Sequence, residues 1–221
     1  MVEYKSVSQA LLVNGRPTYF RGTLDCATFP ITGYPSMDEA YWEKVFKVCQ
    51  DFGLNHVRYH SWFPPEVALK VADRMGVYLQ CEHAWSNKLG DKQLSDYLYK
   101  ELELAIKKYG NHPSFSIHSY GNEPDGPGQD EVLSTWVAKG KKLDEGRRFY
   151  VSAIGWGITE NSDFHDIMDG MRVFPWGIGL NASINKEQPS FNSDFNYKTK
   201  TDPKRAFVAH ETGQWCVYPD F

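Results

Sequence analysis

The period of hydrophobic and polar positions changes repeatedly along this chain, which divides it into short strands and amphipathic helices. Two β-prone runs flank Asn14-Gly15 near the start, and Asn-Gly between such runs is the strongest short-range hairpin signal. Beyond Gly22 the period alternates between two residues, as in a strand, and 3.6 residues, as in a helix. The pattern therefore predicts a β-hairpin followed by repeated strand and helix units.

The units can be placed by their apolar positions and their stop signals. Helices are predicted after a capping box formed by Ser36 and Glu39, from Pro64 to Gly76, from about Ser95 to Tyr109, and from about Asp130 to Leu143. The predicted strands are His56–His60, Val77–His83, a strand that runs from Phe115 into Glu123, Phe149–Ile154, and Arg205–Glu211. Between Gly155 and Pro203 the pattern is weak, and only a short strand near Phe164-His165 is expected there.

Strands that alternate with helices of this length favour parallel β/α units. Repeated this often, they predict an α/β fold of the (β/α)8 TIM-barrel type. With a first strand at Arg21-Gly22 and the weak strand near Phe164-His165 included, seven strands are counted before Phe221, so the barrel is expected to be truncated after strand seven. The expected organisation is a hairpin lead-in over residues 1–20 and a C-terminally incomplete barrel over residues 21–221. An open doubly wound sheet is the alternative, but Arg21-Gly22-Thr23-Leu24 lacks its glycine-rich phosphate loop.

Composition narrows the class of partner. The 221 residues are 41% hydrophobic and carry a formal net charge of −4 with no long basic run, so neither nucleic acid nor an anionic membrane is an expected partner. There is no apolar run of about twenty residues and no signal region at the start. We expect a soluble protein; the sequence does not identify its location and leaves a periplasmic or secreted parent protein open.

The four cysteines are widely scattered, with no C-x-x-C pair that would indicate zinc or redox chemistry. Buried free thiols are expected, because unpaired cysteine prefers protein interiors. No spacing of histidines typical of a metal site occurs either, so neither a metal nor a cofactor is expected.

Two glutamates carry the candidate chemistry. Glu123 and Glu211 each end an extended run and are followed by turn residues, which is how a barrel presents side chains at its C-terminal mouth. If the strand count is right, they end strands four and seven and face each other across the mouth. A pair of carboxyl groups that flank one bond is what hydrolysis of a glycosidic bond requires.

At these residues the chain resembles the catalytic barrel of glycoside hydrolase family 2, which includes β-galactosidases and β-glucuronidases. The resemblance covers roughly residues 11–216. It lies in the run Leu12-Val13-Asn14-Gly15-Arg16-Pro17 leading into Phe20-Arg21-Gly22, in Asn55-His56-Val57-Arg58, in Ala72-Asp73-Arg74-Met75-Gly76-Val77-Tyr78, and in Gly121-Asn122-Glu123. The resemblance implies a retaining O-glycoside hydrolase that acts on β-linked sugars by double displacement.

The resemblance also assigns roles. It makes Glu123 the general acid/base and Glu211 the nucleophile, and it gives Asn122 a hydrogen bond to the sugar hydroxyl next to the anomeric carbon. Arg58 would keep Glu211 ionised, since a nearby cation favours the charged carboxylate. The partner implied is a carbohydrate substrate, with β-sandwich domains flanking the barrel in the full-length protein.

Further residues are candidates for substrate binding. Alternation along the second strand puts His60 on the same face as Arg58. Glu82 and His83 end the third strand, where Glu82 is a candidate for a sugar-hydroxyl contact and one of the two must face the helices. Trp85 and Trp215 fall at predicted loops or strand ends, where aromatic rings suit the apolar faces of sugars.

Several positions depart from the β-galactosidase pattern, among them Leu24-Asp25-Cys26-Ala27 after the first strand and His210 before the second glutamate. These changes concern sugar recognition more than bond cleavage, and they weaken an assignment to galactosides. Two alternatives stay open, namely a non-catalytic carbohydrate-binding or degenerate barrel fragment and a metal-dependent hydrolase on the same fold, because a fold does not by itself define a function.

Overall fold

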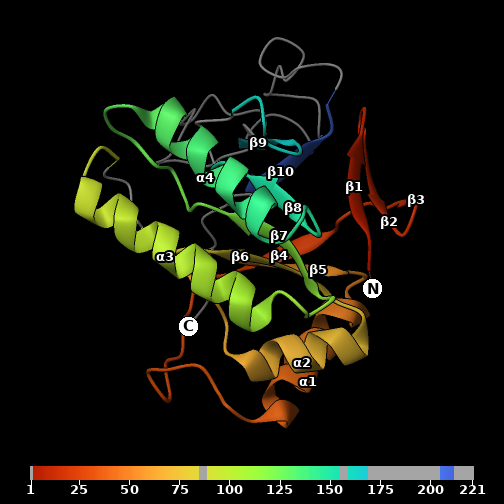
Figure 1. The fold of residues 1–221 in the computed structure, drawn as a ribbon. Helices are drawn as coiled ribbons and strands as arrows, with labels where there is room; N and C mark the ends of the chain where they lie inside the picture. Colours follow the sequence, from red (N-terminus) through yellow and green to blue (C-terminus); the bar gives the residue numbers. More distant parts are fainter. Residues whose placement is uncertain (1, 85–88, 155–158, 169–204, 212–221) are drawn as a thin grey trace, which may run out of the picture.

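The computed structural model describes residues 2–84, 89–154, 159–168 and 205–211, which form a parallel β/α arrangement beside a small antiparallel sheet (Figure 1). The antiparallel sheet has the order β1-β2-β3, and the main sheet has the order β4-β5-β6-β7-β8. A third sheet pairs β10 with β9 in parallel. The strands are β1 Tyr4–Val7, β2 Ala10–Val13, β3 Arg16–Pro17, β4 Gly22–Asp25, β5 His56–Tyr59, β6 Tyr78–Glu82, β7 Phe115–Ser119, β8 Phe149–Val151, β9 His165–Met168 and β10 Phe207–Glu211. The helices are α1 Glu39–Asp51, α2 Glu66–Met75, α3 Lys92–Tyr109 and α4 Gln129–Leu143.

The main sheet follows the predicted barrel order. Each neighbouring pair from β4 to β8 is parallel. Along the chain, each of the helices α1 to α4 connects one strand of this sheet to the next. The strand expected weakly near Phe164-His165 is present as β9, and β10 follows as the seventh parallel strand of the described residues. The predicted α/β barrel fold is therefore confirmed.

The two faces of the parallel strands pack against different partners. Along β7 and β8 the side chains of Ile117, Phe149 and Val151 share one core cluster with Tyr4 and Leu11 of the antiparallel sheet. Their neighbours on the opposite face, such as Tyr150, pack against α3 and α4, which lie next to each other in Figure 1. This alternation is the expected period of two residues in a strand that is buried on both faces.

The lead-in is larger than the predicted hairpin. Asn14-Gly15 does form the turn between β2 and β3, as expected, but β1 adds a third strand that pairs with β2. The hydroxyl of Tyr4 donates to the carbonyl of Pro113, just before β7, at 2.5 Å. The lead-in sheet thus lies against the N-terminal ends of the barrel strands, opposite the end where the candidate site lies.

The predicted capping box of α1 is wrong. Asp38, not Ser36, is the N-cap, and its side chain accepts from the amide of Ala40. The Ser36 hydroxyl instead accepts from the amide of Asp38. A carboxylate one residue from the helix start satisfies a free amide and also lies at the positive end of the helix dipole.

The cysteine prediction holds in part. Cys49 and Cys81 are buried free thiols, but Cys26 is exposed in the segment after β4. Cys216 lies outside the described residues. The exposure of Cys26 follows from its place in a loop, where the preference of cysteine for interiors does not decide its position.

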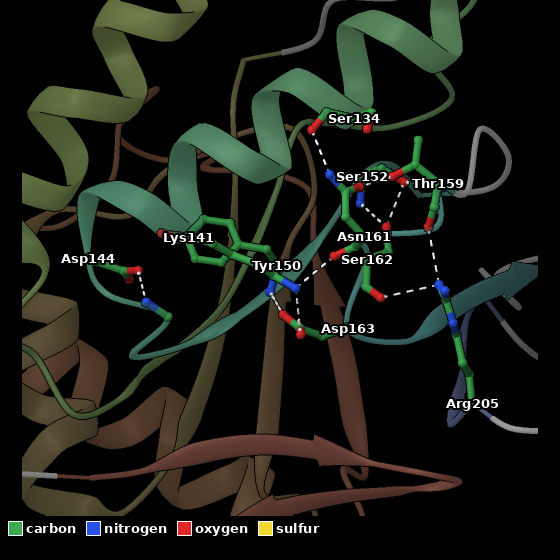
Figure 2. A network of polar contacts seen from close by, with 11 residues as sticks. Ser134, Lys141, Asp144, Tyr150, Ser152, Thr159, Asn161, Ser162, Asp163 and Arg205 are labelled. Carbon is green, nitrogen blue, oxygen red and sulfur yellow. Dashed lines mark hydrogen bonds and ion pairs between the residues drawn. The ribbon is translucent and has the colours of Figure 1, made fainter.

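A polar network holds residues 159–163, which precede β9 (Figure 2). The carboxylate of Asp163 accepts from the Nζ of Lys141 on α4 and from the amide of Tyr150 on β8, both at 2.7 Å. Arg205, two residues before β10, donates to the carbonyl of Thr159 at 3.3 Å. The network thus links α4 and β8 to the residues just before β10, the strand that ends on Glu211.

Candidate active site

A buried cluster of charged and polar side chains lies at the C-terminal ends of β5, β6 and β7. The Nε of Arg58 donates to Oε1 of Glu82 at 2.6 Å, and its Nη2 donates to Oε2 of Glu82 at 3.3 Å. The same Nη2 donates to Oδ1 of Asn122 at 2.7 Å. The exposed fractions are 3% for Arg58, 0% for Glu82 and 7% for Asn122, so this is a desolvated ion pair with an amide attached to it.

Glu82 has further donors. The Nε2 of Gln80 donates to Oε1 at 3.0 Å, and the backbone amide of Ser61 donates to Oε2 at 2.9 Å. Both carboxylate oxygens are therefore occupied by donors from β5, from β6 and from the turn after β5. A buried charge costs little only when it is paired and hydrogen-bonded in this way.

The segment that carries Glu123 leaves the sheet earlier than predicted. Regular pairing in β7 ends at Ser119, and the expectation of a strand that runs into Glu123 is wrong in that respect. An isolated parallel bridge between Asn122 and Ile154 continues the alignment with the end of β8, and the amide of Glu123 donates to the carbonyl of Ile154 at 2.8 Å. The half-buried Glu123 is thereby attached to the sheet beyond its last regular pair.

Positive φ values occur where strands leave the sheet at this end. Glu123 has φ of 46°, Ser61 after β5 has 59°, and Ala27 after β4 has 55°. None of these residues is glycine, and a left-handed conformation costs such residues of the order of 1 kcal/mol. Such strain concentrates at functional sites, where the surrounding contacts hold it.

Glu211 is the last residue of β10. Its backbone pairs with Met168 of β9, with an irregularity in the register after Ala209. The strand end is where the sequence predicted it, but the side chain of Glu211 lies outside the described part of the structure.

The remaining predicted binding residues are only partly described. His60 follows β5 and is half-buried, and its Nδ1 lies 3.1 Å from the hydroxyl of Ser61. Trp85 and Trp215 lie outside the described residues.

Glu82 and His83 face opposite sides of β6, as strand alternation requires. Glu82 joins the cluster with Arg58, whereas His83 faces the helices, where its Nε2 accepts from Nε1 of Trp136 at 3.1 Å. The proton of the neutral ring must then be on Nδ1, which lies 2.7 Å from the carboxylate of Glu101 on α3. The expectation that one of the two residues faces the helices is confirmed.

One residue of the site, Gln80, was not identified from the sequence. Gln80 lies two residues before Glu82, and the strand period of two could have placed it on the same face. Asp25 at the end of β4 is not part of the cluster, because it pairs in register with Tyr59, which packs against the helices, whereas Leu24 pairs with Arg58. Its Oδ1 accepts from the amide of Ala27 at 2.8 Å. Burial raises the pKa of the Asp25 carboxyl, and the bond from Ala27 partly offsets this.

Among the described residues, no three His, Cys, Asp or Glu side chains gather in a way that could hold a metal ion. The described helices include none that is long and apolar enough to cross a membrane.

The fold and this cluster define a class of protein, namely a parallel β/α barrel with ionisable side chains at the C-terminal ends of its strands, which is where enzymes of this architecture have their active sites. The family follows from comparison. The model of the glycosyl hydrolases family 2 TIM barrel domain matches residues 4–174, and the chain belongs to this family.

Two similar proteins are much longer than this chain. The chain is 25% identical over 202 residues to a β-glucuronidase of Mus musculus, which corresponds to 87% of this chain and 31% of that protein. It is 28% identical over 144 residues to a β-galactosidase of Arthrobacter sp. (strain B7), or 60% of this chain and 14% of that protein. The chain thus spans less than a third of the length of these relatives.

Solved structures share the fold. A Parabacteroides merdae β-glucuronidase with glycerol in its active site superposes with a TM-score of 0.66 at 20% identity, over 78% of this chain and 23% of that one. A β-galacturonidase from Eisenbergiella tayi bound to galacturonate gives a TM-score of 0.61 at 19% identity, over 70% of this chain and 28% of that one. At these identities the likeness concerns the fold alone.

Proposed function

We propose that the full-length protein is a retaining β-glycoside hydrolase in which Glu123 is the general acid/base and Glu211 is the nucleophile. The main support is that Glu123 follows the fourth parallel strand and Glu211 ends the seventh, in a chain that belongs to glycosyl hydrolases family 2. Side chains after barrel strands converge on the same mouth, so a sugar bound there can meet both carboxyl groups.

The chemistry requires the two groups to differ in protonation. In the first step Glu211 attacks the anomeric carbon while Glu123 gives its proton to the leaving oxygen, and a glycosyl ester forms on Glu211. In the second step Glu123 takes a proton from water, which attacks the anomeric carbon and releases the sugar with its original configuration. A retaining mechanism predicts carboxyl groups about 5 to 5.5 Å apart, whereas inversion needs room for a water between them.

Asn122 and Arg58 are the proposed binding residues beside the acid. Asn122 would contact the hydroxyl next to the anomeric carbon, and Arg58 would add positive charge near the nucleophile. His60, Trp85 and Trp215 remain proposed contacts to the sugar. The names of the relatives include glucuronidases, a galacturonidase and galactosidases, so uronides and galactosides are the first substrates to try. For the full-length protein we also propose flanking β-sandwich domains.

The test uses the full-length protein with 4-nitrophenyl β-glucuronide, β-galacturonide, β-galactoside and β-glucoside. Proton NMR of the first product formed should show the β-anomer. A 2-fluoro derivative of the cleaved sugar should leave a covalent adduct, and peptide mass spectrometry should locate it on Glu211. Release of the α-anomer would overturn the retaining mechanism, and binding without product would indicate a carbohydrate-binding protein instead.

A further inference from the structure

Glu82 was expected to contact the sugar, but its surroundings indicate a different task. The side chain is fully buried, and its two oxygens receive hydrogen bonds from Arg58, Gln80 and the amide of Ser61. We propose that Glu82 is a positioning residue, which orients the amide of Asn122 through the guanidinium of Arg58. This inference rests on the proposed function, since it concerns how the sugar contact of Asn122 is set up.

The first step is the attachment of Arg58 to Glu82. A guanidinium has its donors in a rigid planar fork, so bonds from Nε and Nη2 to the two oxygens of one carboxylate fix its plane as well as its position. The backbone reinforces this, because Arg58 of β5 pairs in register with Gln80 of β6, and the Gln80 side chain holds the same carboxylate.

The second step is the orientation of Asn122. Arginine has no acceptor atom, so the atom of the Asn122 amide that lies 2.7 Å from Nη2 must be the oxygen. The amide NH2 is left as the donor, and among the described residues it has no hydrogen-bond partner. The cluster therefore presents Asn122 as a donor, and the ligand atom that fits it is a hydroxyl oxygen of the sugar.

Glu82 also acts on the turn after β5. It accepts from the amide of Ser61, whose φ of 59° is unfavourable for a residue with a side chain. The preceding residue is His60, another proposed sugar contact. One buried carboxylate thus connects the ends of β5 and β6 directly and reaches the end of β7 through Arg58 and Asn122.

The negative charge is essential to this arrangement. A glutamine at position 82 would have nearly the same shape, but only one of its two terminal atoms could accept from the donors that now occupy both oxygens. Its NH2 group would face either Arg58 Nε and Gln80, or Arg58 Nη2 and Ser61. The guanidinium would then turn, and it would no longer fix the orientation of the Asn122 amide.

The experiment measures kcat and KM of the full-length protein on the 4-nitrophenyl β-glycoside that it cleaves and on the 2-deoxy form of the same glycoside. The readout is the substrate ratio, defined as kcat/KM on the hydroxylated substrate divided by kcat/KM on the 2-deoxy substrate. Asn122→Ala should lower kcat/KM about 10- to 100-fold on the hydroxylated substrate and much less on the 2-deoxy one, as expected for loss of a hydrogen bond to a strongly polarised group. Glu82→Gln should reduce the ratio in the same direction although it does not touch the sugar.

A matched control is a second buried arginine pair, between Arg148 and Asp144, which connects the end of α4 with the start of β8, at the opposite end of the barrel. Asp144→Asn should lower stability but leave the substrate ratio of the folded protein at the wild-type value. If Glu82→Gln does not fold, Glu82→Asp, which keeps the charge but shortens the side chain, should give an intermediate ratio.

The outcomes separate the two proposals. If the wild type hydrolyses none of the glycosides, the proposed function fails and the role of Glu82 fails with it. If the wild type is active and Asn122→Ala reduces the ratio while the Glu82 variant retains it, only the positioning role is overturned. A Glu82 variant that loses activity equally on both substrates would indicate a purely structural role and would also overturn the proposal.

Discussion

The backbone amide of Glu123 donates a 2.8 Å hydrogen bond to the carbonyl of Ile154, which attaches the candidate acid to the end of β8 after regular pairing in β7 has stopped. A short polar side chain or glycine would adopt φ of 46° more easily than glutamate. The glutamate is therefore held in an unfavourable conformation by contacts with the neighbouring strand, as is common for residues with a task in a site.

The two glutamates should respond differently to the leaving group. Glu211→Gln should reduce turnover to almost nothing on every substrate, since no nucleophile remains. Glu123→Gln should do the same on poor leaving groups but retain much more activity on a 2,4-dinitrophenyl glycoside, whose release needs no proton. Initial rates of the full-length protein on both substrate types test this.

Glu103→Gln, an exposed residue on α3, is the control and should keep wild-type rates. Full activity of Glu211→Gln would contradict the assignment of the nucleophile.

Two buried histidines should make the protein unstable in mild acid. Burial, assisted by Arg58, lowers the pKa of His56 to about 3, and burial, assisted by His83 and Arg148, lowers the pKa of His118 well below its ordinary value. Between pH 6.5 and the folded pKa, the unfolded chain binds protons that the folded chain does not, so stability falls as the pH falls. Each histidine should contribute about 1.4 kcal/mol per pH unit to this slope.

Urea unfolding at pH 7, 6 and 5 measures the slope. His56→Phe removes one of the two groups and should make the slope shallower by about the contribution of one histidine, whatever its effect on stability at pH 7. An unchanged slope would mean that His56 is protonated in the folded protein.

The start of α1 offers a direct comparison of two candidate caps. Asp38→Ala should lower the free energy of unfolding by about 1 kcal/mol, because the amide of Ala40 loses its acceptor. Ser36→Ala should cost less, since Ser36 accepts only from the amide of Asp38 outside the helix. Chemical denaturation of both variants decides the matter, and a larger loss for Ser36→Ala would favour the cap predicted from the sequence.

Gly140 of α4 allows the helix to approach β8. A Cβ at this position would lie 2.7 Å from Cδ1 and 2.9 Å from Cζ of Tyr150, and still closer to Cε1. Alanine is usually about 1 kcal/mol better than glycine inside a helix, yet Gly140→Ala should destabilise the protein by about 1 to 3 kcal/mol through overpacking. Thr135→Ala, at an exposed position of the same helix, is the control; an increase in the denaturation midpoint of Gly140→Ala would contradict the close packing.

The sequence by itself determined the order and type of the elements. Helical and strand periods, with Gly76 and other stop signals, predict the four long helices, and the run before Glu211 predicts β10, because these signals depend only on residues close in the chain. Even the weak β9 was found. The cap of α1 and the early end of β7 were missed. Several neighbouring residues could act as the cap or end the strand, and the backbone geometry decides which of them does.

Only the tertiary structure decided what the charged residues do for one another. Arg58 could have been placed next to any carboxylate at the mouth of the barrel, and Glu82 could have faced the sugar. Arg58 meets Glu82 and Asn122, which lie 24 and 64 residues further along the chain, because parallel register brings the ends of β5, β6 and β7 together. The alternation of a strand states which face a side chain is on, but hydrogen-bond partners across strands follow from register and from the demand that every buried charge be paired.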